Sequence, residues 1–200
     1  DGDTLAQFAA QYPLAQIDEL KGITAGVQNS NFLLATADAK YILTIYESSA
    51  NGVAADDLPF FLGLMQHLSA QGLSCPVPLA RKDGGLISTV KDKPAALVSF
   101  LEGRSVKTPR PEHCRALGAA MAQMHLAGDG FKLRRPNNHG LTNWQTLFER
   151  CRSRADEVSP NLTRAMEREL IRLKENWPDN LPAGIIPVSY THLRAHETDY

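Results

Sequence analysis

The chain has 200 residues, 43% of them hydrophobic, and a formal net charge of −1. This length is enough to bury a core in one domain or two small ones, and the balanced charge argues against a nucleic-acid binder, which normally carries a basic patch. Membrane insertion and secretion are not expected. No run approaches the roughly 20 apolar residues of a spanning helix, and the N-terminus D-G-D-T-L-A-Q-F lacks the basic and apolar regions of a signal peptide.

The cysteines indicate a reducing compartment. Cys75, Cys114 and Cys151 are odd in number and far apart, and none belongs to a C-x-x-C pair. This pattern is typical of reduced thiols in a cytoplasmic protein, so we expect a cytoplasmic location and a packing role for all three. The chain does not begin with Met, so we expect its natural start to lie upstream.

The stretch from Ile17 to Phe100 is predicted to be a small antiparallel sheet with one helix. Strands are predicted at Ile17–Thr24, Asn31–Thr36 and Lys40–Glu47. The last of them reads K-Y-I-L-T-I-Y-E, with the β-branched and aromatic content of a paired strand. The residues A-D-A-K make the turn between the second and third strands.

A helix is predicted to begin at Asp56 or Asp57 and to end at Gly72, because apolar residues recur there at helical spacing. After it come a hairpin turn at Asp83-Gly84-Gly85 and the apolar strand P-A-A-L-V-S-F-L. The buried face of the helix is predicted to comprise Leu58, Phe61, Leu62, Met65 and Leu68.

The chain becomes helical from Thr108 onward. Thr108-Pro109 is predicted to cap and start one helix, Asn143–Arg154 forms a second, and Ser159-Pro160 starts a third that ends near Glu175. His125 lies in the first helix and has no nearby carboxylate in sequence, so we interpret it as structural. The first helix is predicted to bury Cys114, Leu117, Met121 and Met124, and the helices to pack around Trp144 and Trp177.

The stretch G-I-T-A-G-V-Q-N-S-N-F, from Gly22 to Phe32, lies between two predicted strands. It has neither the Lys-Ser or Lys-Thr of a P-loop nor a glycine fingerprint that opens a helix. One interpretation is an ordinary hairpin turn. The other is the turn by which kinase-like folds lay backbone N–H groups over nucleotide phosphates, with Gly26 allowing close approach and Gln28, Asn29 and Ser30 donating hydrogen bonds.

The order of elements favours the second interpretation. A small sheet with one inserted helix, then an apolar strand entering L-E-G-R, then a helical part is the order of a two-lobed kinase. In that arrangement the backbone around Ser99–Leu101 is the hinge that binds the adenine edge, and Gly103 leads the chain into the second lobe.

Several motifs together resemble the aminoglycoside phosphotransferase and choline kinase group, and within it the homoserine kinase branch. The similarity runs from about Leu5 to Ile186. The motifs are the glycine turn above, Y-I-L-T-I-Y-E, D-L-P-F-F-L, G-L-S-C-P-V-P, K-P-A-A-L-V-S-F-L-E-G-R and L-G-A-A-M-A-Q-M-H-L-A.

This resemblance implies an α+β, protein-kinase-like fold: a small antiparallel-sheet lobe with one helix, plus the first helices of a mainly helical lobe. It implies ATP and Mg²⁺ as cofactors, and transfer of the γ-phosphoryl group to the side-chain hydroxyl of homoserine in threonine biosynthesis. The alternatives are another small-molecule kinase of this group, acting on choline, an aminoglycoside or a sugar, and a noncatalytic kinase-like binding module.

One position departs from the general kinase pattern. The third strand of kinases usually carries a Lys or Arg that holds the α- and β-phosphates, whereas this chain has Thr44 there. The homoserine kinase branch resembles this chain in that strand, so the departure favours that branch. The predicted nucleotide-binding residues are Gly22, Gly26, Gln28, Asn29, Ser30, Asn31, Thr44, Ser99, Phe100 and Leu101.

The C-terminal stretch P-V-S-Y-T-H-L-R-A-H-E-T resembles the translation of a sequencing-library adapter. We therefore expect native sequence to end at Ile186, and His192, His196 and Glu197 to form no metal site; the alternative is a genuine short tail that binds a metal or a partner. The expected parts are a nucleotide-binding lobe at 1–102, a partial helical lobe at 103–186 and a non-native tail at 187–200. Catalytic residues and metal ligands are expected beyond Ile186.

Overall fold

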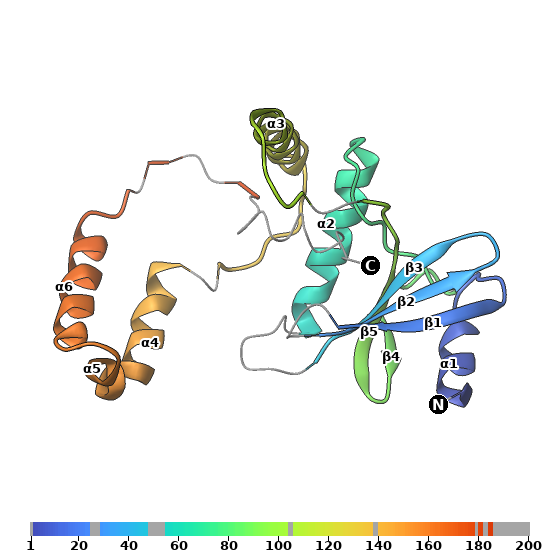
Figure 1. Cartoon of the computed structure of the whole chain (residues 1–200), viewed down its shortest axis with the longest axis horizontal. Helices are drawn as coiled ribbons and strands as arrows, with labels where there is room; N and C mark the ends of the chain where they lie inside the picture. Colours follow the sequence, from blue (N-terminus) through green and yellow to red (C-terminus); the bar gives the residue numbers. More distant parts are fainter. Residues whose placement is uncertain are drawn as a thin grey trace. The chain divides into compact units, whose positions relative to one another are not determined.

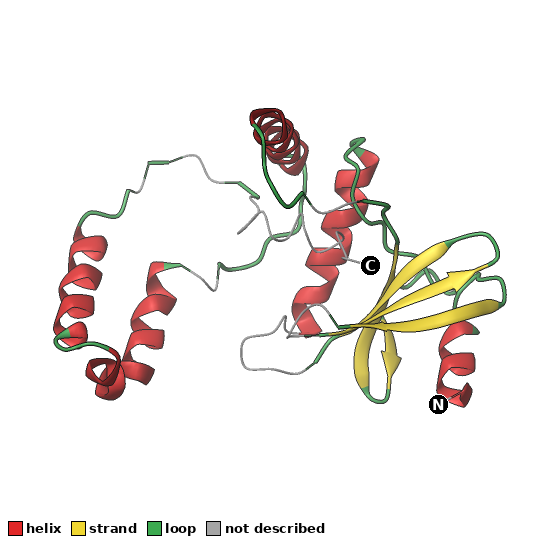
Figure 2. Cartoon of the chain, viewed as in Figure 1, coloured by secondary structure: helices red, strands yellow, loops and turns green. Residues whose placement is uncertain are grey.

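The structure is a computed structural model that describes residues 2–24, 29–47, 55–103, 106–137, 140–178, 180–181 and 184–185. The chain divides into two compact units, one formed by residues 1–133 with 184–200 and the other by residues 134–183. The first unit contains the sheet and the second contains only helices among its described residues (Figures 1 and 2).

A five-stranded antiparallel sheet in the order β1-β2-β3-β5-β4 forms the centre of the first unit. The three strands predicted in the first 50 residues are confirmed, with ends shifted by one or two residues. The apolar strand before the predicted hinge is also confirmed. The strands are β1 (Ile17–Ile23), β2 (Ser30–Thr36), β3 (Lys40–Ile45), β4 (Ser88–Val90) and β5 (Lys93–Ser99).

The hairpin turn predicted at Asp83-Gly84-Gly85 is wrong. That segment closes on itself through a bond from the N–H of Arg81 to the carbonyl of Gly85, 2.8 Å long, and joins no strands. The hairpin turn between β4 and β5 lies at Lys91 and Asp92, whose φ angles are 49° and 63°. A two-residue hairpin turn needs two consecutive positive φ angles. The pair Lys-Asp lacks the glycine by which such a turn is usually recognised in a sequence.

Helix α1 (Gly2–Ala9) was not predicted from the sequence. It brings Phe8, and the turn after it brings Tyr12, against one face of the sheet, where both side chains are buried. Two short turns before a loop give too little periodicity to predict a helix. The cluster on this face, which we call the α1 face, contains Phe8, Tyr12, Leu34, Leu43, Ala95 and Leu97.

Helix α2 (Leu58–Ala70) packs on the opposite face, which we call the α2 face. Leu58, Leu62 and Leu68 are buried, as its apolar spacing predicted, and Gly72 ends the helix region at a φ of 84°. Since side chains alternate along a strand, neighbouring residues of β3 and β5 serve the two faces in turn. The α2 face buries Ile42, Leu62, Ala96 and Val98, with Ile23, Leu33, Met65 and Phe100 partly buried against them.

Helix α3 (Pro111–Gly128) begins two residues later than the sequence predicted. Its first residue is Pro111, and Arg110 before it is extended, as the residue preceding a proline prefers. Near its C-terminal end α3 is held to α2 by a contact of 2.7 Å between Nε2 of His67 and the carbonyl of Ala127. His125 lies in this helix, as predicted.

The packing role predicted for the three cysteines holds in part. Cys75 is half-buried, and burial raises the pKa of its thiol. Cys114 and Cys151 are exposed, so for them the prediction is wrong. Leu117, on the same predicted face as Cys114, is also exposed, because no described element covers that side of α3.

The second unit consists of α4 (Leu141–Cys151), a short 3₁₀ turn η2 (Arg152–Arg154), α5 (Ala155–Val158) and α6 (Leu162–Glu175). Sequence predicted α4 with its 3₁₀ turn as one helix, and placed the start of α6 slightly early. Trp144 and Trp177 meet edge to face with ring centroids 5.5 Å apart, which confirms their predicted packing role.

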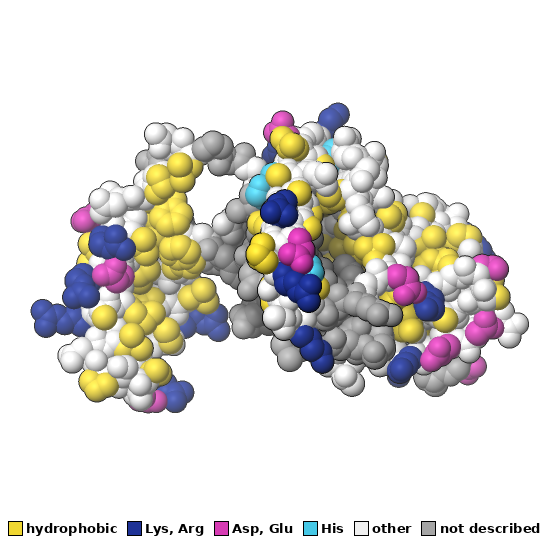
Figure 3. Space-filling model, turned by 45° about the horizontal axis from the view of Figure 1, so that its top comes forward, with side chains coloured by type: hydrophobic (Ala, Val, Ile, Leu, Met, Phe, Trp, Pro, Cys, Tyr) yellow, Lys and Arg dark blue, Asp and Glu magenta, His cyan; other side chains and the backbone are white. Residues whose placement is uncertain are grey.

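Apolar side chains remain exposed on the second unit. Leu162, Met166, Leu170 and Leu173 of α6, which share one face, are partly buried, because α4 packs against α6. Val158 and Ile171 are 81% and 59% exposed. Figure 3 shows hydrophobic side chains gathered over this unit. None of the helices in the described ranges is both long and apolar enough to cross a membrane.

A first prediction concerns Tyr12, whose hydroxyl is buried without a well-formed hydrogen bond in the described part of the chain. Burial raises its pKa from 10.0 to about 12, although nearby Arg81 and Ser88 lower it in part. The folded chain therefore holds this proton more tightly than the unfolded chain does, so Tyr12 makes stability independent of pH below about 10 and lowers it as the pH rises from 10 towards 12.

Tyr12→Phe is expected to leave the melting temperature at pH 7 unchanged or slightly raised, because it removes an unsatisfied polar atom. Above pH 10 the melting temperature of the variant should increasingly exceed that of the parent protein, since a phenylalanine has no proton to lose. Thermal melting of both proteins at neutral and alkaline pH measures this. A lower melting temperature of the variant at pH 7 would show that the hydroxyl makes a stabilising bond.

Candidate functional site

The glycine turn joins the ends of β1 and β2, where Ile23 pairs with Asn31. Gly26 and Gln28, two of its predicted nucleotide-binding residues, lie outside the described residues. Gly22 pairs with Phe32 inside the sheet, and a Cβ at Gly22 would sit 3.9 Å from the Phe32 ring. A side chain there would point to the α1 face, in ordinary contact, so Gly22 is not required by close packing.

Asn31 and Thr44 lie on the α2 face at the end of the sheet next to the glycine turn. They are cross-strand partners in β2 and β3, and Thr44 also pairs with Ala96 of β5. The hydroxyl Oγ1 of Thr44 donates to Oδ1 of Asn31 over 2.9 Å. Thr44 therefore lies on the side of the sheet that packs against α2, and it is tied to a second predicted site residue.

Ser30 belongs to a different cluster, on the α1 face. Its Oγ donates to Oε1 of Glu47 over 2.9 Å, and Lys93 forms an ion pair with the same carboxylate. Both hydrogen bonds lower the pKa of Glu47, and the one from Lys93 has the larger effect. The side chain of Asn29 accepts a bond of 3.3 Å from the backbone N–H of Glu47. Asn29 and Ser30 thus connect the base of the glycine turn to the end of β3.

The Glu47–Lys93 pair was not predicted, because 46 residues separate its partners and only the sheet brings them together. In exposed positions such pairs contribute little to stability. The register of β5 puts Lys93 on the side of the sheet away from Thr44, where Glu47 pairs with it.

The predicted hinge follows β5. The N–H of Ser99 donates to the carbonyl of Val77 and its Oγ accepts from the Val77 N–H, both over 2.9 Å. The N–H of Phe100 donates to the carbonyl of Lys40 over 3.1 Å. The N–H and carbonyl of Leu101 make no hydrogen bond within the described residues. Leu101 is thus the first residue after β5 whose backbone N–H makes no hydrogen bond within the described residues.

An apolar surface extends along the α2 face between the hinge and the glycine turn. Val98 and Ala96 are buried beneath it against Leu62 of α2, and the partly buried Ile23, Leu33 and Phe100 form its accessible part. Lys40 lies over the Phe100 ring, with Nζ 5.6 Å from its centroid, and also pairs with Glu102 at 3.3 Å. A flat aromatic ligand on this surface would have Leu101 at one end and the Asn31–Thr44 pair at the other.

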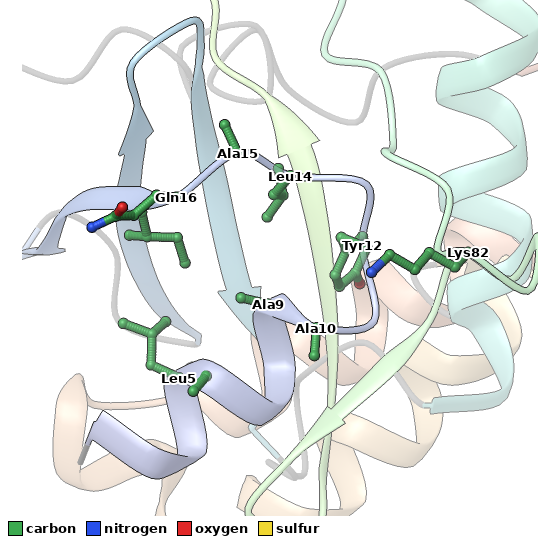
Figure 4. A pocket seen from close by; sticks show the side chains of 10 residues that line it. Leu5, Ala9, Ala10, Tyr12, Leu14, Ala15, Gln16 and Lys82 are labelled. Atoms are coloured by element: carbon green, nitrogen blue, oxygen red, sulfur yellow. The ribbon is translucent and has the colours of Figure 1, made fainter.

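The described residues contain no group of three or more His, Cys, Asp or Glu side chains placed to hold a metal ion, and His192, His196 and Glu197 lie outside them. A shallow pocket of about 410 Å³ lies between α1, the start of β1 and Lys82 (Figure 4). It contains none of the predicted nucleotide-binding residues and lies on the α1 side of the sheet.

Comparison with known proteins shows to which family the chain belongs. A model of the phosphotransferase enzyme family matches residues 19–186. The chain belongs to this family. The structural relatives have the same fold at low identity: amicoumacin kinase hAmiN, with TM-score 0.54, 18% identity and coverage of 68% of this chain and 42% of that one, and a spectinomycin phosphotransferase, with TM-score 0.55, 11% identity and coverage of 89% and 59%. The predicted kinase-like α+β fold is confirmed.

Curated relatives are similar at much higher identity. A homoserine kinase of Allorhizobium ampelinum is 53% identical over 182 residues, which are 91% of this chain and 56% of that protein. One of Rhizobium etli is 52% identical over 184 residues, which are 92% and 56%. The chain thus spans little more than half the length of these members of the phosphotransferase enzyme family.

Proposed function

We propose that this chain is the nucleotide-binding part of a kinase that transfers the γ-phosphoryl group of ATP to the side-chain hydroxyl of L-homoserine. The observation that carries this proposal is the identity of about half the residues to homoserine kinases over more than nine-tenths of the chain. The predicted lobes at 1–102 and 103–186 remain part of the proposal, with the hinge between them and a cytoplasmic location.

The geometry around the hinge fits an adenine. Its ring would lie against the partly buried side chains of Ile23, Leu33 and Phe100, while the N–H of Leu101 donates to a ring nitrogen and the carbonyl groups at Ser99 to Leu101 accept from the amino group. The phosphates would then extend towards the glycine turn, where Gly26, Gln28 and Asn29 are proposed to offer donors. This chain's own residues bind and orient the nucleotide.

The groups that act on the acceptor are proposed to lie after Ile186. Phosphoryl transfer depends on divalent metal ions held by carboxylates and on a residue that orients the attacking hydroxyl. The described residues hold no such carboxylate cluster, so we assign no Mg²⁺ ligand among them. We propose Mg²⁺ as the metal because it is the ion that neutralises the phosphates of ATP in phosphoryl transfer.

A noncatalytic binding module is the second candidate, favoured by one observation. Thr44 stands where kinases carry the lysine that pairs with the α- and β-phosphates. Retained ATP binding without turnover would identify such a module. Preference for choline, an aminoglycoside or a sugar would instead keep the kinase and change the acceptor.

Leu101→Pro tests the nucleotide site. The full-length protein, meaning the gene product that contains residues 1–186 and their native continuation, is the proper material. Proline removes the N–H of Leu101 and no hydrogen bond of the described fold, so ATP is expected to bind about tenfold more weakly at an unchanged melting temperature. Leu101→Ala keeps the N–H and is the control. Equal ATP affinity in both variants, by titration calorimetry, would show that adenine binds elsewhere.

A further inference from the structure

Because Thr44 carries no charge, another side chain of the sheet must hold the phosphates, and the sheet carries the cations Lys93 and Lys21. Lys93 lies on the α1 face, paired with Glu47, so it does not replace a lysine on the α2 face. Lys21 of β1 pairs with Leu33, which puts it on the α2 face by register. Lys21 is therefore the alternative phosphate-binding side chain, and the experiments below include it.

The bond between Thr44 and Asn31 determines how the Asn31 amide is oriented. Because the hydroxyl of Thr44 donates to Oδ1 of Asn31, at 2.9 Å, the oxygen end of the amide is directed to β3. The Nδ2 end, with its two N–H donors, is directed away from Thr44. Within the described residues Nδ2 has no hydrogen-bond acceptor. Asn31 also lies next to the glycine turn, opposite Ile23 in register.

We infer that Asn31 donates from Nδ2 to a phosphate oxygen of ATP, and that Thr44 is a positioning residue that holds the Asn31 amide in this orientation. This inference rests on the proposed function and names the phosphate contact of that same site. A neutral amide thus takes the place of a lysine ammonium. The contact is a hydrogen bond to a charged oxygen, which is stronger than one between neutral groups.

The alternative is that the pair only ties β2 to β3. Two observations favour a ligand role over that alternative. The two strands are already joined by their backbone ladder on both sides of this pair, from Ser30 opposite Ile45 to Ala35 opposite Lys40. In addition, the pair is only partly buried and stands at the turn end of the apolar surface, where the phosphates of a hinge-bound nucleotide would lie.

Asn31→Asp separates the two roles. The carboxylate keeps an oxygen acceptor for Thr44 but replaces the N–H donors with a negative charge. In the full-length protein we expect ATP affinity to fall about tenfold or more, because a hydrogen bond is exchanged for repulsion. Adenosine, which has no phosphate, should bind within about twofold of its original affinity. The melting temperature should not change.

Thr44 is tested by two variants that differ in one group. Thr44→Val keeps the shape but removes the hydroxyl, so the KM for ATP is expected to rise severalfold while the affinity for adenosine stays the same. Thr44→Ser keeps the hydroxyl and should restore the original KM. Lys21→Gln is expected to leave the ratio of ATP to adenosine affinity unchanged.

Every outcome of these measurements either supports or overturns the phosphate contact inferred for Asn31. Unchanged ATP affinity in Asn31→Asp, an equal loss of ATP and adenosine binding, or a selective loss of ATP binding in Lys21→Gln instead would overturn the inference while the proposed function stands. If the folded, unaltered full-length protein binds neither ATP nor adenosine, the proposed function itself fails.

Discussion

We expect the 200-residue chain to release no measurable ADP from ATP with homoserine, choline or an aminoglycoside as acceptor. The full-length protein should release ADP with homoserine when Mg²⁺ is present. In phosphoryl transfer nearly all of the rate enhancement comes from positioning and from charge stabilisation by metal ions. The described residues contain no group of three or more His, Cys, Asp or Glu side chains placed to hold a metal ion, and the chain spans 56% of its Allorhizobium ampelinum relative.

An assay that couples ADP release to NADH oxidation measures both proteins under the same conditions. Removing Mg²⁺ with a chelator should abolish the activity of the full-length protein. ADP release by the 200-residue chain at a rate comparable to that of the full-length protein would show that residues 1–186 hold a complete catalytic site.

The second large effect is on stability. Leu62 of α2 is fully buried against Ile42, Ala96 and Val98. Leu62→Ala would leave a cavity between α2 and the sheet, so the free energy of unfolding of the sheet-containing unit should fall by about 2–5 kcal/mol. The control is Leu126→Ala on α3, where the side chain is 78% exposed and a change within about 0.5 kcal/mol is expected.

Urea unfolding followed by circular dichroism compares the variants, and hydrogen exchange of the Val98 amide reports on the sheet itself. Because the α2 face also carries the proposed adenine surface, Leu62→Ala should weaken ATP binding by more than Leu126→Ala does. Equal effects of the two substitutions on unfolding would contradict the packing of α2 on the sheet.

Most of the first unit follows from patterns that are local in sequence. The strands β2, β3 and β5 are dense in β-branched and apolar residues, and α2 has its leucines at helical spacing, so both were predictable. The turn at Lys91-Asp92 was not, because its positive φ angles are imposed by the pairing of β4 with β5 rather than by turn residues. Helix α1 was missed because its packing on the sheet, not its length, stabilises it.

For the candidate site, the sequence suggests a set of residues but not the contacts between them. Sequence placed Asn29, Ser30 and Asn31 together, and the alternation of β2 then separates Ser30 from Asn31 by sending them to opposite faces. The N–H groups of the two residues before Leu101 are occupied by the carbonyls of Val77 and Lys40, whereas that of Leu101 is not, and only the folded chain reveals this difference. Whether these residues bind nucleotide remains a prediction.

The most direct test of the account is the acceptor preference of the full-length protein. Homoserine, choline and an aminoglycoside are assayed side by side with saturating ATP and Mg²⁺, and phosphorylation of the acceptor is followed by mass spectrometry. We predict that homoserine gains one phosphoryl group on its side-chain hydroxyl while the other two are unchanged. Phosphorylation of choline or the aminoglycoside in preference to homoserine, or of none of the three while ATP still binds, would contradict the account.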